Sequence, residues 1–338
     1  MKPKIKYSIE LLRGILATNV AICHYYLSYL NNIHLELISS LSVEIFFVIS
    51  GFVLAPQIIK IFESNKFSNF KIFLFRRFLR TLPVYFFYLG IISLILGKIF
   101  SLDFFKFFFF IQNFFKINLE SDYYPIAWSL SVEEWFYLLF TPILLFSKKI
   151  FNIKNIFKFI IVWFSFFYLL KFIYFLFNDF NWGEDIRRVT IFRLDSIVIG
   201  LLFYLFQDKF LSILRKYNHY LLPFIVILYF FIFFNLSTRN IFIVEIIFLS
   251  ISIFAVLSLA LFISNEELIS SKLNNFSYLF GGISYSIYLS HMLLIIIKSK
   301  EDIEINLFYY LLVLFLLSFT SRKFIEEPFL KNRPQFKS

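Results

Sequence analysis

The sequence is short of cysteine and of charge. Its single cysteine, Cys23, excludes an intramolecular disulfide framework and any metal site made of several cysteines. Charged residues make up 16% of the 338 residues, whereas a soluble domain would have roughly a quarter. So little polar surface cannot cover a water-soluble globule, and we expect a lipid bilayer to be the solvent.

The residues that are present support this interpretation. Hydrophobic residues reach 60% and the mean hydropathy is +0.78, as a membrane-embedded chain requires. A net charge of +11 would suggest nucleic acid in a soluble protein, but here the basic residues lie between apolar runs. We interpret them as topology signals and lipid-headgroup contacts, and expect no nucleic-acid partner. Because the first apolar run contains Arg13 and His24 and no small-residue cleavage site, we expect a first span rather than a signal peptide.

Runs of about 20 apolar residues predict an all-α, polytopic membrane protein with about ten transmembrane helices. The runs lie at 8–30, 35–56, 81–97, 126–147, 157–177, 189–207, 219–236, 240–263, 278–298 and 303–320. The apolar stretch 104–118 is short and interrupted by polar residues, so it is predicted to be interfacial or re-entrant. Most basic residues then fall on the side of the N-terminus, which predicts the inner membrane with both termini cytoplasmic. No repeat or linker is visible, and residues 1–338 are predicted to form a single domain.

Charged residues inside the spans are the candidate site, because each costs several kcal/mol in hydrocarbon unless it faces a protein interior or a wet cavity. Arg13 and His24 share one face of the first span, about 16 Å apart. Alternatively, Arg13 reaches the headgroups and His24 hydrogen-bonds a neighbouring helix. Arg76, Arg77 and Arg80, the arginine cluster, enter the third span at its boundary. They are suited to gripping phosphates, or serve only as a topology anchor.

Carboxylates form the second group of candidates. Glu44 precedes IFFVISGF in the second span and needs a partner at that depth. Glu133 and Glu134 are adjacent in WSLSVEEWFY, so at least one has to face inward, paired or protonated; a structural ion pair is the alternative.

Further polar residues lie near the outer ends of later spans. They are Trp128, Ser129, Arg193, Asp195 and His291. With His24, Glu44 and Glu133 they predict an outer polar layer, whereas Arg13, the arginine cluster and Glu327 predict a layer toward the cytoplasm.

The ordered motifs resemble acyltransferase family 3, membrane O-acyltransferases of bacteria and related organisms. The motifs are Arg13 with ten residues before His24, VEIFFVISGF at 43–52, RRFLRTLPVY at 76–85, WSLSVEEWFY at 128–137, FRLDSIVIG at 192–200, SYSIYLSH at 284–291 and IEEPF at 325–329. They extend over nearly the whole chain. Two positions depart from the family pattern: Glu44 stands where Asp is more usual, and Thr81 where Ile is commoner.

The resemblance implies that an acyl group, usually acetyl, passes from cytoplasmic acetyl-CoA to a hydroxyl of an extracytoplasmic or lipid-linked glycan, without a metal. Arg13 and the arginine cluster would hold CoA, and the polar residues of the later spans would hold the acceptor. His24 is suited to act as the base, or to be transiently acylated. Glu133 or Glu44 would orient it, and Arg193 or His291 would stabilise the oxyanion or the acceptor.

Two other classes of protein share part of this pattern. A secondary transporter or a flippase for a glycan or small solute also needs intramembrane His, Glu and Arg, but consumes no acyl-CoA. A non-catalytic membrane scaffold would leave the aligned polar residues unexplained.

Overall fold

The computed structural model describes residues 6–151, 155–178, 182–235 and 241–335. Over these residues every regular element is a helix or a helical turn, and no strand is present. The predicted all-α class is therefore confirmed.

Ten long helices occur in the described parts of the chain. They are α1 (Tyr7–Leu27), α2 (Ile33–Ser64), α3 (Phe67–Ile95), α5 (Ala127–Phe151), α6 (Ile156–Phe177), α7 (Ser196–Lys216), α8 (Asn218–Asn235), α9 (Ile241–Ser264), α11 (Asn274–Lys300) and α12 (Leu307–Ser321). Each overlaps one predicted span. Eight stretches of the described chain are long and apolar enough to cross a membrane; α1 and α8 are not among them. The count of ten spans stays a prediction.

The segment 104–118 does not form a spanning helix, in agreement with the sequence. Helix α4 (Leu102–Phe108) has seven residues and begins at Ser101, whose Oγ accepts the backbone N–H of Phe104 at 3.1 Å. Seven residues rise about 10 Å, a third of the hydrocarbon thickness. The chain then continues without a helix to Asn118.

The helix that contains the third predicted span is longer than that span. Helix α3 begins at Phe67, well before residue 81, and its first turns bury Phe70 and Phe73. Only Asn65 and Lys66 separate α3 from α2, and Asn65 adopts a φ of 50°, which asparagine tolerates better than most residues. The arginine cluster therefore lies inside a helix and not at its entrance.

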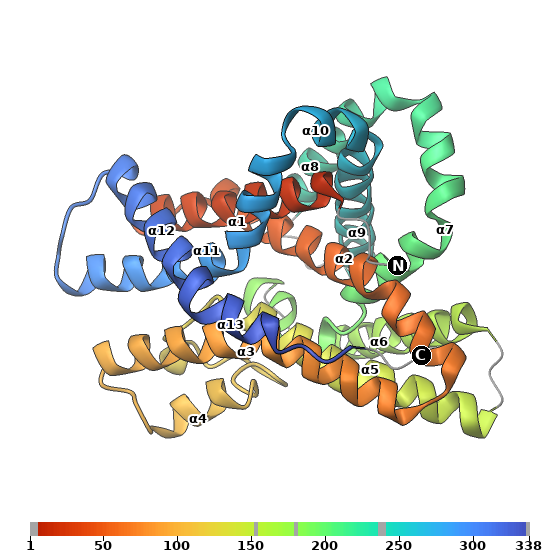
Figure 1. The fold of residues 1–338 in the computed structure, drawn as a ribbon, viewed down its shortest axis with the longest axis horizontal. Helices are drawn as coiled ribbons and strands as arrows, with labels where there is room; N and C mark the ends of the chain where they lie inside the picture. Colours follow the sequence, from red (N-terminus) through yellow and green to blue (C-terminus); the bar gives the residue numbers. More distant parts are fainter. Residues whose placement is uncertain (1–5, 152–154, 179–181, 236–240, 336–338) are drawn as a thin grey trace. The chain divides into compact units, whose positions relative to one another are not determined.

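The chain divides into two compact units, whose helices are labelled in Figure 1. Unit 1 consists of Met1–Ile49, Leu205–Thr238 and Phe242–Lys323, and unit 2 of Ser50–Tyr204, Arg239–Ile241 and Phe324–Ser338. Helices α2 and α7 thus contribute to both.

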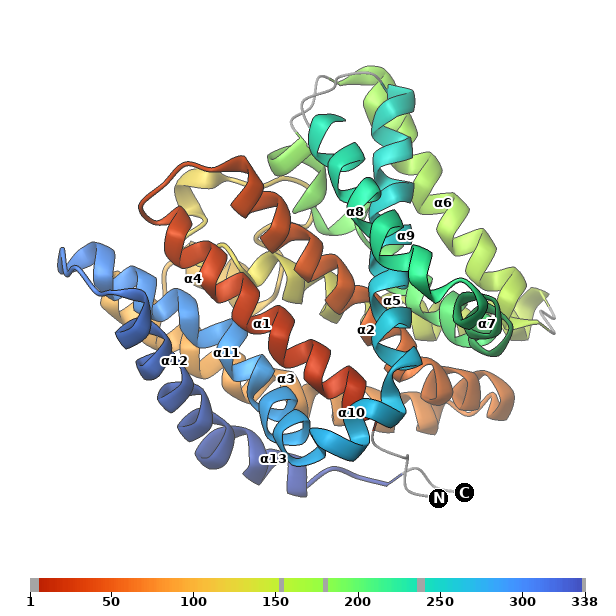
Figure 2. The same ribbon diagram turned by 90° about the horizontal axis from the view of Figure 1, so that it is seen from above.

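In unit 1, α1 packs along α11 (Figure 2). A Cβ at Gly14 would come within 2.4 Å of the Phe280 ring, so only glycine permits this approach. Phe280 is near the start of α11, and at the other end Lys298 donates to Ser28 Oγ at 2.6 Å. Both helices therefore run in the same direction.

Unit 2 has an aromatic interior between α3, α5 and α6. Tyr85, Tyr137 and Phe136 are fully buried, and Trp163 donates its indole N–H to the carbonyl of Leu194 at 2.9 Å. This packing fixes α5, which carries Trp128 and Ser129, and the segment just before α7, which carries Arg193 and Asp195.

Candidate active site

His24 lies in a chain of hydrogen bonds inside unit 1. Its Nδ1 is 2.9 Å from Nε2 of His291 on α11, and its Nε2 is 3.2 Å from Ser39 Oγ on α2. His291 is fully buried, and its Nδ1 lies 3.3 Å from the carbonyl oxygen of Ile287. Two of the predicted site residues, 267 positions apart in sequence, are thus in direct contact.

When both rings are neutral, these partners assign their tautomers. A carbonyl oxygen only accepts, so Nδ1 of His291 carries its proton and Nε2 has the lone pair. Nδ1 of His24 then donates to His291, which leaves the Nε2 of His24 as the basic atom. That nitrogen faces the hydroxyl of Ser39, so a hydroxyl group already occupies hydrogen-bonding distance. The arrangement is chemically suited to taking a proton from an alcohol.

Glu44 lies in unit 1 with His24 and is buried, with 6% of its surface exposed. It follows Ser39 by five residues on α2, which corresponds to about 140° around the helix axis. Glu44 and Ser39 therefore point to different sides of α2.

Arg13 shares α1 with His24, as predicted, and pairs with Glu10 at 3.5 Å. The side chain of Arg13 is 16% exposed. Glu10 is a counter-ion that the sequence analysis did not single out, although a carboxylate three residues from an arginine on a helix is the spacing of a pair.

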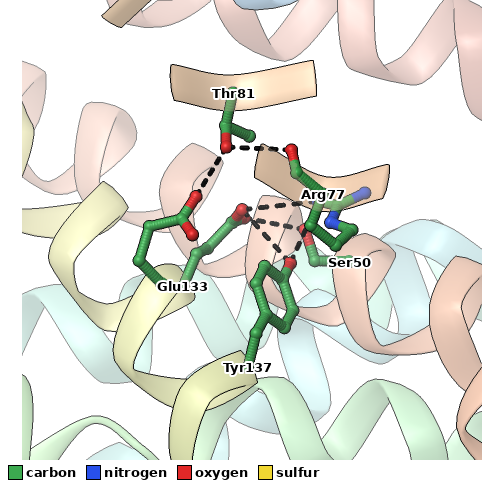
Figure 3. Close-up of polar contacts among 6 residues, drawn as sticks. Ser50, Arg77, Thr81, Glu133 and Tyr137 are labelled. Carbon is green, nitrogen blue, oxygen red and sulfur yellow. Dashed lines mark hydrogen bonds and ion pairs between the residues drawn. The ribbon is translucent and has the colours of Figure 1, made fainter. Parts of the chain in front are cut away.

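A second polar cluster lies in unit 2, around Glu133 (Figure 3). Ser50 donates to Glu133 Oε1 at 2.7 Å, and the Tyr137 hydroxyl donates to Oε2 at 3.3 Å. Arg77 donates to the Tyr137 hydroxyl at 3.1 Å and lies 3.9 Å from Glu133 Oε2. One carboxylate therefore holds a serine, a tyrosine and an arginine from three helices.

This contact corrects the prediction of two separate polar layers. Arg77 and Glu133 were assigned to opposite layers, but they form an ion pair and lie at one depth. The reason is the early start of α3: Arg77 is ten residues into the helix, about 15 Å from its beginning. Glu133, six residues into α5, meets it there.

Glu134 is also part of this cluster. It is 2% exposed, and the hydroxyl of Thr81 donates to its Oε1 at 2.7 Å. Its Oε2 has no hydrogen-bond partner among the described residues. Thr81, one of the two departures from the family pattern, supplies a donor that isoleucine lacks. Thr81 follows Arg77 by four residues and lies on the same helix face, and this spacing could have indicated from the sequence that it belongs to the cluster.

The remaining predicted residues of α5 lie at its first turn. Trp128 faces the Arg187 guanidinium, whose carbon is 5.9 Å from the ring centre. The Ser129 hydroxyl donates to the carbonyl of Ile126 at 3.1 Å, within its own turn.

Asp195 has a partner that the sequence analysis missed. The ammonium of Lys171 on α6 lies 2.5 Å from its Oδ2, and both side chains are buried. Arg193, two residues earlier, is 2% exposed. Lys171, deep inside the apolar run 157–177, was the signal for this pair, since a buried cation needs a counter-ion.

Arg76 and Arg80 lie four residues apart on α3, and Arg76 donates to the carbonyl of Pro334 at 2.6 Å. In the described parts of the chain no three His, Cys, Asp or Glu residues are grouped as a metal site.

Comparison with known proteins identifies the family. Residues 6–321 match the family model described as an acyltransferase domain. The chain belongs to this acyltransferase family. The resemblance inferred from the motifs is thereby confirmed, as is the assignment of the chain to the acyltransferase enzymes.

Two relatives share part of this acyltransferase. An uncharacterized protein of Haemophilus influenzae is 35% identical over 144 residues, which are 38% of this chain and 58% of that protein. The peptidoglycan O-acetyltransferase OatA of Listeria monocytogenes is 30% identical over 140 residues, 36% of this chain and 22% of that protein. The matches thus span about three fifths and one fifth of the two relatives. No solved structure matches this chain significantly.

Proposed function

We propose that the chain is a membrane O-acyltransferase that moves an acyl group, acetyl in the simplest case, from cytoplasmic acyl-CoA to a hydroxyl of an extracytoplasmic or lipid-linked glycan. The observation that carries this proposal is the hydrogen-bond chain in which His291 leaves Nε2 of His24 as a base. Family membership supports acyl transfer. The name of the Listeria relative, a peptidoglycan O-acetyltransferase, supports an O-linked product and a glycan acceptor.

The chemistry follows from the His24 geometry. An acceptor hydroxyl at the place of the Ser39 hydroxyl would give its proton to Nε2 of His24 as its oxygen attacks the thioester carbonyl. The new C–O bond forms, the C–S bond breaks, and the CoA sulfur leaves with the proton from His24. If His24 itself is acylated first, the same Nε2 is the nucleophile, and the alcohol displaces it in a second step.

The arginine cluster is proposed to hold the phosphates of the donor, because guanidinium groups match phosphate oxygens in charge and shape. Glu133 fits a role in fixing Arg77, which it contacts both directly and through Tyr137. Arg13 is proposed as a further contact of the donor, and Trp128, Ser129, Arg193 and Asp195 are proposed as contacts of the acceptor. His291, whose ring nitrogens lie against Ile287 and His24, is proposed to position His24 instead.

We further propose ten spans, with both termini on the cytoplasmic side of the inner membrane and lipids as neighbours. Seven long helices separate α1 from α11 in sequence: α2, α3, α5, α6, α7, α8 and α9. Because α1 and α11 run parallel, an odd number of crossings has to lie between them. If the short apolar helix α8 crosses the membrane, the number of crossings is seven, which is odd. Without α8 it would be six, which is even and does not fit the parallel helices. The family match includes segments of both units, which supports a single catalytic domain.

A transporter or flippase remains the second candidate, since it also needs buried charges such as the Lys171–Asp195 pair. The experiment that separates the two is an assay of thiol release from acetyl-CoA by the protein in lipid nanodiscs, with and without candidate glycans. An acyltransferase releases CoA in proportion to acylated glycan. A protein that moves glycan across vesicles without consuming acetyl-CoA would contradict the proposal.

A further inference from the structure

The C-terminal segment lies against the arginine face of α3. Helix α13 (Glu327–Lys331) packs on α3 (Figure 1). Beyond it, the carbonyl of Pro334 accepts a hydrogen bond from Arg76 at 2.6 Å. The neighbouring residue, Arg333, is thereby brought to the arginine cluster, although it lies outside the 6–321 acyltransferase match.

Four guanidinium groups gather at this place. Burial, together with repulsion from Arg80, Arg77 and Arg76, lowers the pKa of Arg333 to about 9, and Glu326 offsets only part of this. The Nε atoms of Arg77 and Arg333 are buried and have no hydrogen-bond partner among the described residues. The nearby carboxylate Glu133 pairs with Arg77 at 3.9 Å and also accepts hydrogen bonds from Ser50 and Tyr137, so it balances only one of the four charges.

The positive charges of such a cluster repel one another, and a bound anion would reduce this repulsion. Like charges held close together in a partly buried place oppose one another, and a multiply charged phosphate would pair with several guanidinium forks at once. We propose that Arg333 completes, with Arg76, Arg77 and Arg80, one binding site for phosphate groups. The proposal rests on the proposed function in so far as acyl-CoA supplies the phosphates; an anionic lipid headgroup offers the same chemistry.

The test uses the full chain in nanodiscs of neutral phosphatidylcholine and measures the Kd of CoA and of pantetheine, which has no phosphate. Arg333→Gln should weaken CoA binding roughly tenfold and leave pantetheine unchanged. The Kd of CoA for Arg333→Lys should lie between those of the wild type and Arg333→Gln, because lysine keeps the positive charge but lacks the planar guanidinium group that binds two phosphate oxygens at once. Lys331→Gln is the matched control, since it removes one exposed charge from the same segment and should change the Kd less than twofold. Unfolding temperatures show whether each variant remains folded.

A parallel arm measures how much phosphatidylglycerol each variant retains after purification from mixed lipid. Loss of CoA affinity in Arg333→Gln identifies the donor as the source of the phosphate. Loss of bound phosphatidylglycerol alone, with CoA affinity unchanged in Arg333→Gln and Arg77→Gln, keeps the site but contradicts the donor role of the cluster. If Arg77→Gln weakens CoA binding while folded Arg333→Gln changes neither ligand, only the role of Arg333 is overturned. If Arg333→Gln weakened the binding of pantetheine as much as that of CoA, the proposed phosphate-binding role of Arg333 would also be overturned.

Discussion

Nδ1 of His24 lies 2.9 Å from Nε2 of His291, so one imidazole orients another. In a Ser-His-Asp triad the orienting group is a carboxylate that also stabilises the imidazolium. Here the partner is a second imidazole. It sets the tautomer of His24 without adding a negative charge next to the base.

Replacement of His24 by Ala should abolish acylation, a loss of roughly a hundredfold or more, because it removes Nε2 of His24, the proposed base. The Kd of CoA should change less than twofold. His34→Ala is the control: His34 is exposed and stacks on Phe233, with ring centres 3.9 Å apart. Acylated glycan is quantified by mass spectrometry. Full activity of the His24 variant would remove the base assignment.

Replacement of His291 by Ala should lower kcat roughly ten- to a hundredfold without changing the Kd of CoA, a smaller loss than the roughly 10⁴-fold of a triad whose aspartate is neutralised. The sequence has four histidines, so replacing His34 and His219 by Asn leaves two for ¹⁵N NMR. His24 should then show a protonated Nδ1 and an unprotonated Nε2. The His291 variant should show a mixture of tautomers. An unchanged His24 spectrum would mean that His291 does not orient it.

Thr81→Val should destabilise the protein by about 1–3 kcal/mol, because Glu134 Oε1 would lose the 2.7 Å hydrogen bond from the threonine while remaining buried. Thr81→Ser, which keeps the hydroxyl, should lose less than half as much. Unfolding in detergent, followed by tryptophan fluorescence, measures both. Equal losses in the two variants would point to packing of the methyl group instead.

Lys171→Met should cost about 3–5 kcal/mol, since Asp195 would be left as an unpaired buried charge. The double variant Lys171→Met with Asp195→Leu should recover most of this loss, because it removes both charges. Thermal unfolding of Lys171→Met, Asp195→Leu and the double variant gives the three values of a double-mutant cycle. Additive losses would show that the 2.5 Å pair is not coupled in the native protein.

Stability should fall as the pH rises from about 4 to 6. Burial raises the pKa of Asp122, in the segment before α5, to about 6, although Arg188 at 3.6 Å opposes the shift. The folded state therefore holds a proton that the unfolded chain has released, and folding becomes less favourable as that proton is lost, by roughly 2–3 kcal/mol. Asp122→Asn should flatten this part of the stability profile, measured as unfolding temperature against pH. The same slope in the variant would assign it to another group.

Several features of this protein could be predicted from sequence because they depend on local composition. The scarcity of charge predicted a bilayer as the solvent, and apolar runs of bilayer length predicted the positions of the ten long helices found in the described residues. Arg13 and His24 were assigned to one helix face from their spacing alone. The part of α3 that precedes the predicted span was not predicted, because a charged segment can continue a helix without having the composition of a span.

The partners of the charged groups were decided only by tertiary structure. Helical spacing shows which face of a helix a residue occupies, but not which helix lies opposite. Packing of α1 on α11 brings His291 to His24, and packing of α3 on α5 brings Arg77 to Glu133. The sequence by itself determined that buried charges exist, because that follows from the cost of placing them in hydrocarbon. The tertiary structure decided how each is paired, because a hydrogen bond or ion pair forms only where packed helices bring two side chains within about 3–4 Å.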